Sequence, residues 1–370
     1  MRQAAKVVLG LSGGVDSAVA GALLLEAGYR VEGLFMKNWE EDDEVGYCAA
    51  EADLAMARDV AVQLGIPLHK ANYAAEYWRR VFAHFLAEYE VGRTPNPDIL
   101  CNREVKFPAL LDYAHRLGAT HVASGHYADT LHEHGTSHLL RAADEGKDQT
   151  YFLCRITQAQ LRPALFPLGG LLKTEVRRIA QDLGLPNHSR KDSTGICFNG
   201  ERRLRDFLSR YLHAPDGDIC TVEGRIIGRH RGLMFYTPGQ RQGLGIGGVE
   251  GAGEAPWYVV ARDIQRNRLV VAQQADHPLL LSDGLVTEPP HWILHPPTQG
   301  ESLLARIRHR QPLQVARITH MSANGLRVTF AEPQRAVAPG QSIVFYRDRE
   351  CLGGAVIAGG NARSDMPLPV

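Results

Sequence analysis

A glycine-rich loop near the start of the chain constrains its fold more than any other feature. Its sequence is GLSGGVDS, from Gly10 to Ser17. An apolar, β-branched run over residues 5–11 leads into it, and residues 15–27 have the pattern of a helix that stops at Gly28. Glycines at a strand-to-helix turn leave backbone N–H groups free, and the helix N-terminus adds a favourable dipole. The sequence therefore predicts a phosphate-binding turn.

The loop lacks the lysine of a GxxxxGK[ST] loop, which excludes the kinase and GTPase type. It resembles instead the SGGxDS loop of the PP-loop ATP pyrophosphatases, a superfamily that includes several classes of enzyme. The resemblance implies that ATP is split between its α- and β-phosphates, that Asp16 helps to hold Mg²⁺, and that Ser17 hydrogen-bonds a phosphate. The residues expected to bind ATP are Gly10, Leu11, Ser12, Gly13, Gly14, Val15, Asp16 and Ser17.

Strands and helices alternate through the first half of the chain. Further strands are predicted over residues 31–36, 66–70 and 121–124, with helices over 53–64, 76–89 and 104–117 between them. This alternation predicts an α/β domain whose parallel sheet has right-handed crossovers. Ligands on such sheets bind at the carboxyl ends of the strands.

The pattern changes near residue 200. A helix over 204–212 is followed by Gly- and Pro-rich segments with short strands at 257–261 and 268–272. Short runs at 303–307, 314–318, 326–330, 342–346 and 354–357 then predict a small antiparallel β-barrel, with a loop at 288–297. We therefore expect a catalytic domain over residues 1–203, a small central mixed domain over 204–275 and a C-terminal barrel over 276–370.

The composition is that of a globular protein. The 370 residues suffice for two or three domains, Lys+Arg and Asp+Glu are both 41, and no apolar run approaches the roughly 20 residues of a membrane span. After Lys191 every basic residue is an arginine, and arginine clusters near residues 202–205, 225–231 and 306–310 are candidate phosphate contacts. The start of the chain lacks the layout of a signal peptide, so we expect a cytoplasmic location with reduced thiols.

Two of the six cysteines lie in polar segments. One is predicted in the first turn of a helix, and the other follows a polar glycine loop. Cys101 follows PNPDIL, where Asp98 is expected to cap a helix and Arg103 and Lys106 lie close in sequence. Cys197 follows RKDSTGI. Both settings predict reactive thiolates, although an isolated cysteine is more often buried and inert. Cys48, Cys154, Cys220 and Cys351 lack these features and are interpreted as structural, and the absence of CxxC argues against a zinc module.

A pair of reactive thiols is what sulfur transfer requires. One thiol carries a terminal sulfur as a persulfide, and the other attacks it or resolves the disulfide that remains. An oxygen adenylated by ATP would supply the electrophilic carbon, and Asp98 beside Cys101 is placed to move the proton.

Seven segments together resemble the tRNA-specific 2-thiouridylases, the MnmA/TrmU family, and they occur in the right order over nearly the whole chain. They are LSGGVDS, PNPDILCNREVKF, SGHYA, KDQTYFL, KDSTGICF, TPGQRQGLGIGG and CLGGA. The resemblance implies a PP-loop domain, a central domain and a β-barrel. It also implies ATP-dependent 2-thiolation of the wobble uridine in the Lys, Glu and Gln tRNAs, with a persulfide sulfur donor and without membrane association.

The resemblance assigns roles to further residues of this chain. Cys101 is expected to be the nucleophile, Cys197 the persulfide carrier, and the two to end as a disulfide. Met36 and Gly125 would line the adenine or ribose pocket. Asn96, Pro97 and Asp98 would contact the uridine, which must leave its stack to react. The tRNA-contacting residues are expected to be His126, Lys147, Asp148, Gln149, Arg308, His309 and Gln341.

Two other functions fit parts of the sequence. A PP-loop ligase acting on a small carboxylate or amide would need neither the cysteine pair nor a basic surface. A nucleotide-sensing RNA-binding protein would keep the loop without turnover. A dinucleotide site at Gly243, Gly245 and Gly248 is rejected, because this GxGxxG pattern does not lie between a strand and a helix.

Overall fold

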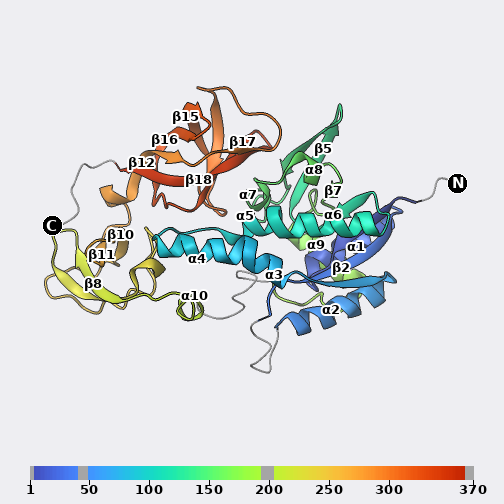
Figure 1. Ribbon diagram of the computed structural model, residues 1–370, viewed down its shortest axis with the longest axis horizontal. Helices are drawn as coiled ribbons and strands as arrows, with labels where there is room; N and C mark the ends of the chain where they lie inside the picture. Colours follow the sequence, from blue (N-terminus) through green and yellow to red (C-terminus); the bar gives the residue numbers. More distant parts are fainter. Residues whose placement is uncertain (1–3, 41–48, 193–203, 363–370) are drawn as a thin grey trace.

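A five-stranded parallel sheet forms the centre of the N-terminal region of the computed structural model, which describes residues 4–40, 49–192 and 204–362 (Figure 1). Its spatial order is β3-β2-β1-β4-β7. The strands are β1 (Lys6–Gly10), β2 (Arg30–Lys37), β3 (Leu68–Asn72), β4 (His121–Ala123) and β7 (Ala164–Leu165). The chain leaves β1 toward β2 on one side and returns to β4 on the other. The β1/β4 boundary is thus a switch point of the kind where α/β sheets bind ligands.

Both faces of this sheet are covered by helices, which explains why β1 is apolar throughout. Val7 and Leu9 pack into a core with α1 (Val15–Glu26), α2 (Ala49–Leu64) and α9 (Lys173–Asp182). Val8, on the opposite face, packs into a second core with α6 (Phe107–Arg116), α7 (Thr150–Leu153) and α8 (Gln158–Leu161).

Two long helical stretches contain π-helical turns. The first runs through α3 (Ala74–Tyr77), η2 (Trp78–Phe82) and α4 (Ala83–Glu90), and the second runs through α5 (Pro97–Cys101), η3 (Asn102–Lys106) and α6. Every boundary residue between these pieces has right-handed helical φ and ψ, so each stretch is continuous. Single π-turns inside α-helices are frequent at functional sites, and η3 begins directly after Cys101.

The central region contains a four-stranded sheet in the order β10-β11-β8-β9. Its elements are α10 (Leu204–Leu208), β8 (Asp216–Thr221), β9 (Ile226–Arg231), η4 (Leu233–Phe235), β10 (Tyr258–Asp263) and β11 (Arg268–Ala272). A 3₁₀ turn, η5 (Pro278–Leu280), leads into the next sheet. The helix predicted over residues 204–212 is thus shorter than expected.

The C-terminal region is a closed antiparallel barrel, because its first and last strands, β12 and β18, pair with each other. Its strands run in the order β12-β16-β15-β14-β17-β18. They are β12 (Leu281–Thr287), β14 (Ser302–Arg306), β15 (Gln314–Ser322), β16 (Gly325–Arg335), β17 (Ser342–Arg347) and β18 (Glu350–Ala362). A short strand, β13 (His291–Trp292), pairs with β18 inside the segment that was predicted to be a loop.

A hairpin from the N-terminal region extends the barrel sheet. It consists of β5 (Ala128–Glu133) and β6 (Thr136–Arg141), and β6 pairs with β18 at Leu139–Cys351 and Leu140–Glu350. Beside this seam the Asp148 carboxylate forms an ion pair of 3.2 Å with the Arg306 guanidinium, and both side chains are buried. The barrel is therefore attached to the catalytic region through backbone pairing and a buried charge pair.

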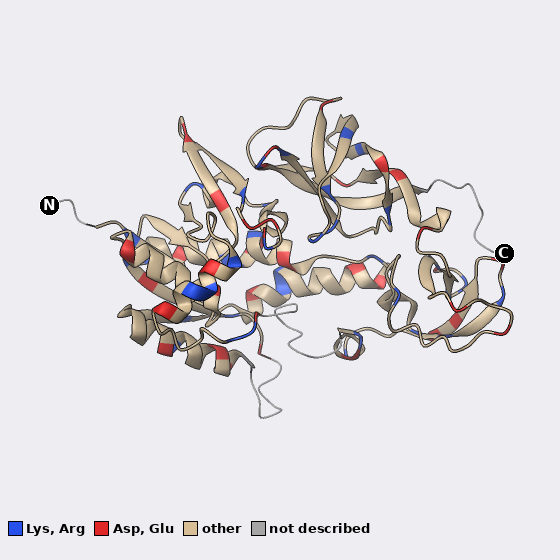
Figure 2. Cartoon of the chain, turned by 180° about the vertical axis from the view of Figure 1, so that it is seen from behind, with Lys and Arg blue, Asp and Glu red and all other residues tan. Residues whose placement is uncertain are grey.

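The α/β class with a parallel N-terminal sheet and a C-terminal barrel is confirmed. The hairpin β5–β6 and the helices α7, α8 and α9 were not predicted from the sequence. None of the described helices has the length and apolar character that a membrane crossing requires. Acidic and basic residues are interspersed through all three regions (Figure 2), as the balanced composition leads one to expect.

Replacing Asp148 with alanine is expected to lower the free energy of unfolding by about 3–5 kcal/mol, because Arg306 would keep a buried, unpaired charge. Urea denaturation of the full chain measures this. Asp182→Ala serves as the control, since it removes an exposed pair with Arg178 and should change stability by less than about 1 kcal/mol. Equal, small effects of the two substitutions would contradict the structural role of Asp148.

Candidate functional site

The glycine-rich loop follows β1 and opens α1, as predicted. Gly13 has φ of +80°, and a Cβ there would lie 2.5 Å from the carbonyl oxygen of Asp53, so only glycine fits. The Ser17 hydroxyl is buried and donates to the Gly14 carbonyl at 3.0 Å. Ser12 Oγ accepts from the Gly14 N–H at 3.3 Å. These contacts hold the loop in shape at the switch point of the sheet.

A second loop, which follows β4, lies directly against the first. A Cβ on Gly125 would be 2.7 Å from Ser17 N and 2.8 Å from the carbonyl carbon of Asp16. Side chains cannot approach backbone this closely, so the glycine lets the two loops touch. That Gly125 lines the nucleotide pocket stays a prediction, and the glycine lies next to the phosphate loop. Met36, near the end of β2, is half-buried and packs against the core on the α6 face.

Cations gather beside Asp16. Lys173 Nζ lies 2.6 Å from Asp16 Oδ1 and 2.8 Å from Asp192 Oδ1. Asp192 also pairs with Lys147 at 2.9 Å and with Arg177 at 2.6 Å. Burial by itself would raise the pKa of Asp192, but the hydrogen bonds from Lys147 and Lys173 outweigh it and hold the pKa far below its usual range. This cationic cluster next to a phosphate loop is suited to a polyphosphate.

Lys173 was missed by the sequence analysis, as was Tyr127, whose hydroxyl donates to Asp16 at 3.0 Å. A lysine at the start of a short helix has no pattern of its own. The available signal was indirect: a phosphate loop with an aspartate and no lysine requires a cation from elsewhere in the chain. Among the described residues, no group of three or more His, Cys, Asp or Glu side chains could hold a metal by itself.

The setting of Cys101 differs from the prediction. Asn96, not Asp98, caps the helix: its side chain accepts from the Asp98 N–H at 3.1 Å, and Pro97 occupies the first helical position. Cys101 is therefore the last residue of α5, beyond the first turn, and it is buried in an aromatic cluster that includes Trp39 and Phe82. The prediction of a polar, loop-borne setting is thus wrong for Cys101. Cys197 and Cys48 lie outside the described residues.

Cys154, Cys220 and Cys351 are buried and unpaired. Burial raises the pKa of all three thiols, that of Cys154 to about 12. These thiols are therefore protonated and unreactive, which agrees with their interpretation as structural residues.

Lys106 connects the cysteine helix with the loop after β4. Its ammonium lies 3.4 Å from His126 Nε2, and Ser124 Oγ lies 2.8 Å from His126 Nδ1. Burial, with a smaller contribution from Lys106, lowers the pKa of His126 well below its usual value. Burial also raises the pKa of Asp98, and this effect exceeds the opposing influence of the Lys106 charge. A histidine with a lowered pKa and a carboxyl with a raised pKa thus both interact with Lys106, which lies five residues after Cys101 in the chain.

Thr94, just before this helix, is fixed by all three regions of the chain. Its N–H donates to the Pro339 carbonyl at 2.8 Å, and its carbonyl accepts from Gln341 Nε2 at 2.8 Å. Its hydroxyl lies 3.2 Å from that of Thr237 in the central region. Gln341, expected to contact tRNA, thus holds the segment that leads into Asn96, Pro97 and Asp98.

The other residues expected at tRNA fall into two adjoining groups, Lys147–Gln149 and Arg308–His309. His309 Nε2 bonds the Asp148 carbonyl at 2.9 Å, and Arg308 Nη2 donates to the Ala336 carbonyl at 2.8 Å. The structure thus brings the two groups together. The buried Asp148 carboxylate does not support a side-chain contact with tRNA, and Gln149 Oε1 accepts from the Tyr127 N–H at 2.9 Å.

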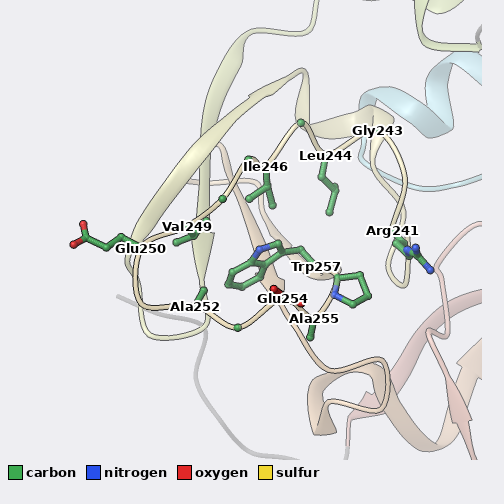
Figure 3. Close-up of a pocket in the computed structure, with 15 residues that line it drawn as sticks. Arg241, Gly243, Leu244, Ile246, Val249, Glu250, Ala252, Glu254, Ala255 and Trp257 are labelled. Atoms are coloured by element: carbon green, nitrogen blue, oxygen red, sulfur yellow. The ribbon is translucent and has the colours of Figure 1, made fainter.

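The Gly-rich segment of the central region forms a pocket of about 740 Å³ (Figure 3). Leu244 and Ile246 extend toward the Trp257 indole in this view. Gly243 lies in a turn and Gly245 in a stretch without regular secondary structure, so neither lies between a strand and a helix. The pocket contains none of the predicted site residues.

Comparisons with known proteins define first the class and then the family. Residues 5–201 match the family model of a tRNA methyl transferase HUP domain, 205–273 a tRNA methyl transferase PRC-barrel domain, and 282–357 an aminomethyltransferase beta-barrel domain. The chain is thus a nucleotide-binding α/β protein with two appended β regions. The division into domains over residues 1–203, 204–275 and 276–370 stays a prediction.

Curated relatives then identify the family. The chain is 58% identical over 354 residues to the tRNA-specific 2-thiouridylase MnmA of Methylococcus capsulatus, covering 95% of each chain. It is 57% identical over 356 residues to that of Alcanivorax borkumensis, covering 96% of this chain and 98% of the relative. The chain belongs to the tRNA-specific 2-thiouridylase family, a family of ATP-using tRNA sulfurtransferases.

One of the matches among solved structures is a distant likeness. An NMN synthetase from Francisella tularensis aligns with a TM-score of 0.34 and 18% identity over 56% of this chain and 73% of the other. At this similarity it carries no argument about function.

Replacing Gly125 with alanine is expected to abolish or strongly weaken ATP binding, because the added Cβ would push the loop after β4 away from Ser17 and Asp16. Isothermal titration with ATP measures the effect. Gly170→Ala is the matched control, since nothing lies within 4 Å of a Cβ there. ATP affinity at the level of the unsubstituted protein in Gly125→Ala would show that this contact does not shape the nucleotide site.

Proposed function

We propose that this enzyme converts the wobble uridine of the Lys, Glu and Gln tRNAs to 2-thiouridine, by adenylation of the uracil C2 oxygen followed by sulfur transfer from a cysteine persulfide. One chain of contacts supports the proposal. Gly125 touches the phosphate loop, the adjacent His126 contacts Lys106, and Lys106 lies five residues after Cys101 on one continuous helix. The nucleotide loop and the cysteine helix therefore belong to one site.

In this proposal the loop from Gly10 to Ser17 binds the phosphates of ATP, and Lys173 and Lys147 neutralise their charge. The uracil oxygen attacks the α-phosphorus, pyrophosphate leaves, and the C2–O bond becomes a bond to a good leaving group, AMP. Mg²⁺ prefers one or two carboxylates together with phosphate oxygens, so the Asp16 carboxylate fits its binding. The ion would supply further charge neutralisation on the phosphates.

The transfer of sulfur to uracil uses both thiols. The terminal sulfur of the Cys197 persulfide attacks C2, the C2–O bond breaks, and AMP leaves with the oxygen. The Cys101 thiolate then attacks the Sγ of Cys197, breaks the S–S bond and leaves the sulfur on uracil as 2-thiouridine. Release of hydrosulfide by Cys101 before the attack on C2 gives the same products. Either route ends in a Cys101–Cys197 disulfide, which a reductant must reopen.

Burial of Cys101 sets a condition on this chemistry. The thiol lies in an aromatic cluster and must reach Cys197 and the uracil, so α5 has to turn or the cluster has to open when tRNA binds. The π-turn η3 directly after Cys101 is a place where a helix can change its register at low cost. Asn96 and Asp98, fixed through Thr94, then meet the flipped base, and Asp98 takes the thiol proton.

We further propose that the tRNA is held by Arg308, His309 and Lys147, with Asp148, Gln149, His126 and Gln341 acting through the residues that they position. Such phosphate contacts make binding weaken with increasing salt. The sulfur would come from a persulfide carrier, either a desulfurase or a relay protein, in the cytoplasm.

Replacing Cys197 with serine should abolish 2-thiouridine formation yet preserve adenylation, because only the sulfur carrier is lost. Mass analysis of nucleosides from unmodified tRNA incubated with enzyme, ATP and a persulfide donor measures the first, and pyrophosphate release measures the second. Cys220→Ser is the matched control and should leave both unchanged. Normal 2-thiouridine formation by Cys197→Ser would refute the persulfide role, and pyrophosphate release driven by small acids but not tRNA would refute the substrate.

Replacing Lys106 with methionine should move the acid limb of the thiolation rate to higher pH. Asp98 must be ionised to accept a proton, and its raised pKa rises further when the nearby cation is removed. As the pH falls, activity is then lost at a higher pH than in the unsubstituted enzyme. Lys106→Arg keeps the charge and should leave the limb in place. The measurement is the pH dependence of single-turnover rates with persulfide-loaded enzyme. If the acid limb of Lys106→Met lies at the same pH as that of the unsubstituted enzyme, Asp98 is excluded as the titrating base.

A further inference from the structure

One large aromatic side chain beside the helix of Cys101 is exposed. Trp78 is the first residue of the π-turn η2 and is 37% exposed. Its indole stacks on that of Trp39 with ring centroids 5.7 Å apart, and its ring also contacts those of Phe82 and Tyr211. Trp39 and Phe82 belong to the aromatic cluster that buries Cys101. Trp78 therefore forms an exposed end of that cluster, on a π-turn of the kind that is frequent at functional sites.

The aromatic cluster lies at the edge of the sheet where the nucleotide loop lies. Trp39 comes two residues after the end of β2, and the loop from Gly10 to Ser17 follows β1, which pairs with β2 in parallel. Parallel neighbours end at the same edge of a sheet, so both segments leave it on one side. The π-turn η2 also packs against α5, which runs from Pro97 to Cys101. Trp78 is thus connected to the segment that is expected to receive the uridine.

Two arginines follow Trp78 directly, and both are exposed. Arg80 Nη1 donates to the Glu104 carbonyl at 3.3 Å, which places this side chain beside the π-turn η3. The Arg79 side chain is 66% exposed and lies 3.5 Å from the Glu76 carboxylate, a pair that water largely screens. Both guanidinium groups therefore keep donors for an anion beside the indole.

A cavity of about 590 Å³ adjoins Tyr211, whose ring centroid lies 5.8 Å from that of Trp78. Its lining includes Arg205, Arg210 and Arg231 against two aspartates. The surface thus alternates aromatic rings with cationic side chains. A nucleic acid strand alternates bases with phosphates in the same way, whereas an apolar protein segment would gain nothing from the arginines.

We propose that Trp78 is a stacking platform for one of the two bases that flank the target uridine in the tRNA. A uridine that reacts must leave its stack, so each flanking base loses a stacking partner on one face. The indole ring takes the vacated place whichever base lies there, because stacking on an aromatic ring tolerates every base. Arg79 and Arg80 then hold the adjacent phosphates. The inference rests on the proposed function, which supplies the extruded uridine.

Two substitutions separate stacking from packing. Trp78→Leu keeps an apolar side chain over the aromatic cluster but removes the ring, and Trp78→Tyr keeps a ring. The tRNA should bind Trp78→Leu at least about fivefold more weakly, which is the loss that one stacked base causes, and should bind Trp78→Tyr nearly as tightly as the unsubstituted enzyme. The salt dependence of binding should stay the same, because stacking releases no counterions. Trp257→Leu, which removes a ring from the separate Gly-rich pocket, is the matched control and should leave tRNA binding unchanged.

A photochemical probe identifies the side chain on which the base lies. The full chain is mixed with an unmodified Glu tRNA in which the uridine on the 5′ side or on the 3′ side of the wobble uridine is replaced with 5-iodouridine. Irradiation cross-links 5-iodouridine to an aromatic ring stacked on it, and mass spectrometry of the peptides locates the bond. One of the two tRNAs should cross-link to Trp78 in the unsubstituted enzyme and to the same position in Trp78→Tyr, but not in Trp78→Leu. Thermal unfolding followed by circular dichroism shows that the variants are folded.

Cross-links of both tRNAs to other residues only, or equal tRNA affinity of Trp78→Leu and the unsubstituted enzyme, overturn the platform. Equal weakening in Trp78→Leu and Trp78→Tyr also overturns it, since the indole would then only pack against the cluster. If the unsubstituted enzyme still forms 2-thiouridine from tRNA, ATP and a persulfide donor, these results leave the proposed function standing. If it forms none, the proposed function fails, and the platform fails with it.

Discussion

The close approach of two loops at the switch point of the sheet is the constraint on which the rest of the site depends. Gly125 lies against the first turn of α1 without room for a Cβ, which sets the distance between the ends of β1 and β4. From this point His126 reaches Lys106 on the cysteine helix. Asp16, in the same first turn, reaches Lys173 and, through it, the segment before Cys197. One backbone contact thus links the nucleotide loop to the helix of Cys101 and to the segment that ends at Asp192.

The barrel holds this site in place, since barrel residues expected to contact tRNA also bind segments next to the predicted catalytic residues. Gln341 and Pro339 bind Thr94, and His309 binds the turn that contains Lys147. A tRNA bound across the barrel would therefore press on residues that are already connected to Asn96 and Lys173.

Local sequence rules predicted the parts of the molecule that local interactions determine. The apolar run of β1, the glycines of its loop and the alternating strands of the barrel have patterns with one physical interpretation, and the fold class followed from them. The helix cap was assigned to Asp98 instead of Asn96, because both residues are good caps and only the backbone conformation distinguishes them. Lys173 and the β6–β18 pairing could not be predicted, since both join residues more than 150 positions apart.

The burial of Cys101 shows why a motif predicts chemistry better than it predicts the setting of a side chain. Arg103 and Lys106 lie close to Cys101 in sequence and suggested an electropositive surface, but the helix turns the thiol toward Trp39 and Phe82. The aromatic cluster keeps water and oxidants away from the Cys101 thiol in this conformation. In the proposed mechanism, tRNA would act on the helix of Cys101 through Thr94, which Gln341 and Pro339 of the barrel hold in place.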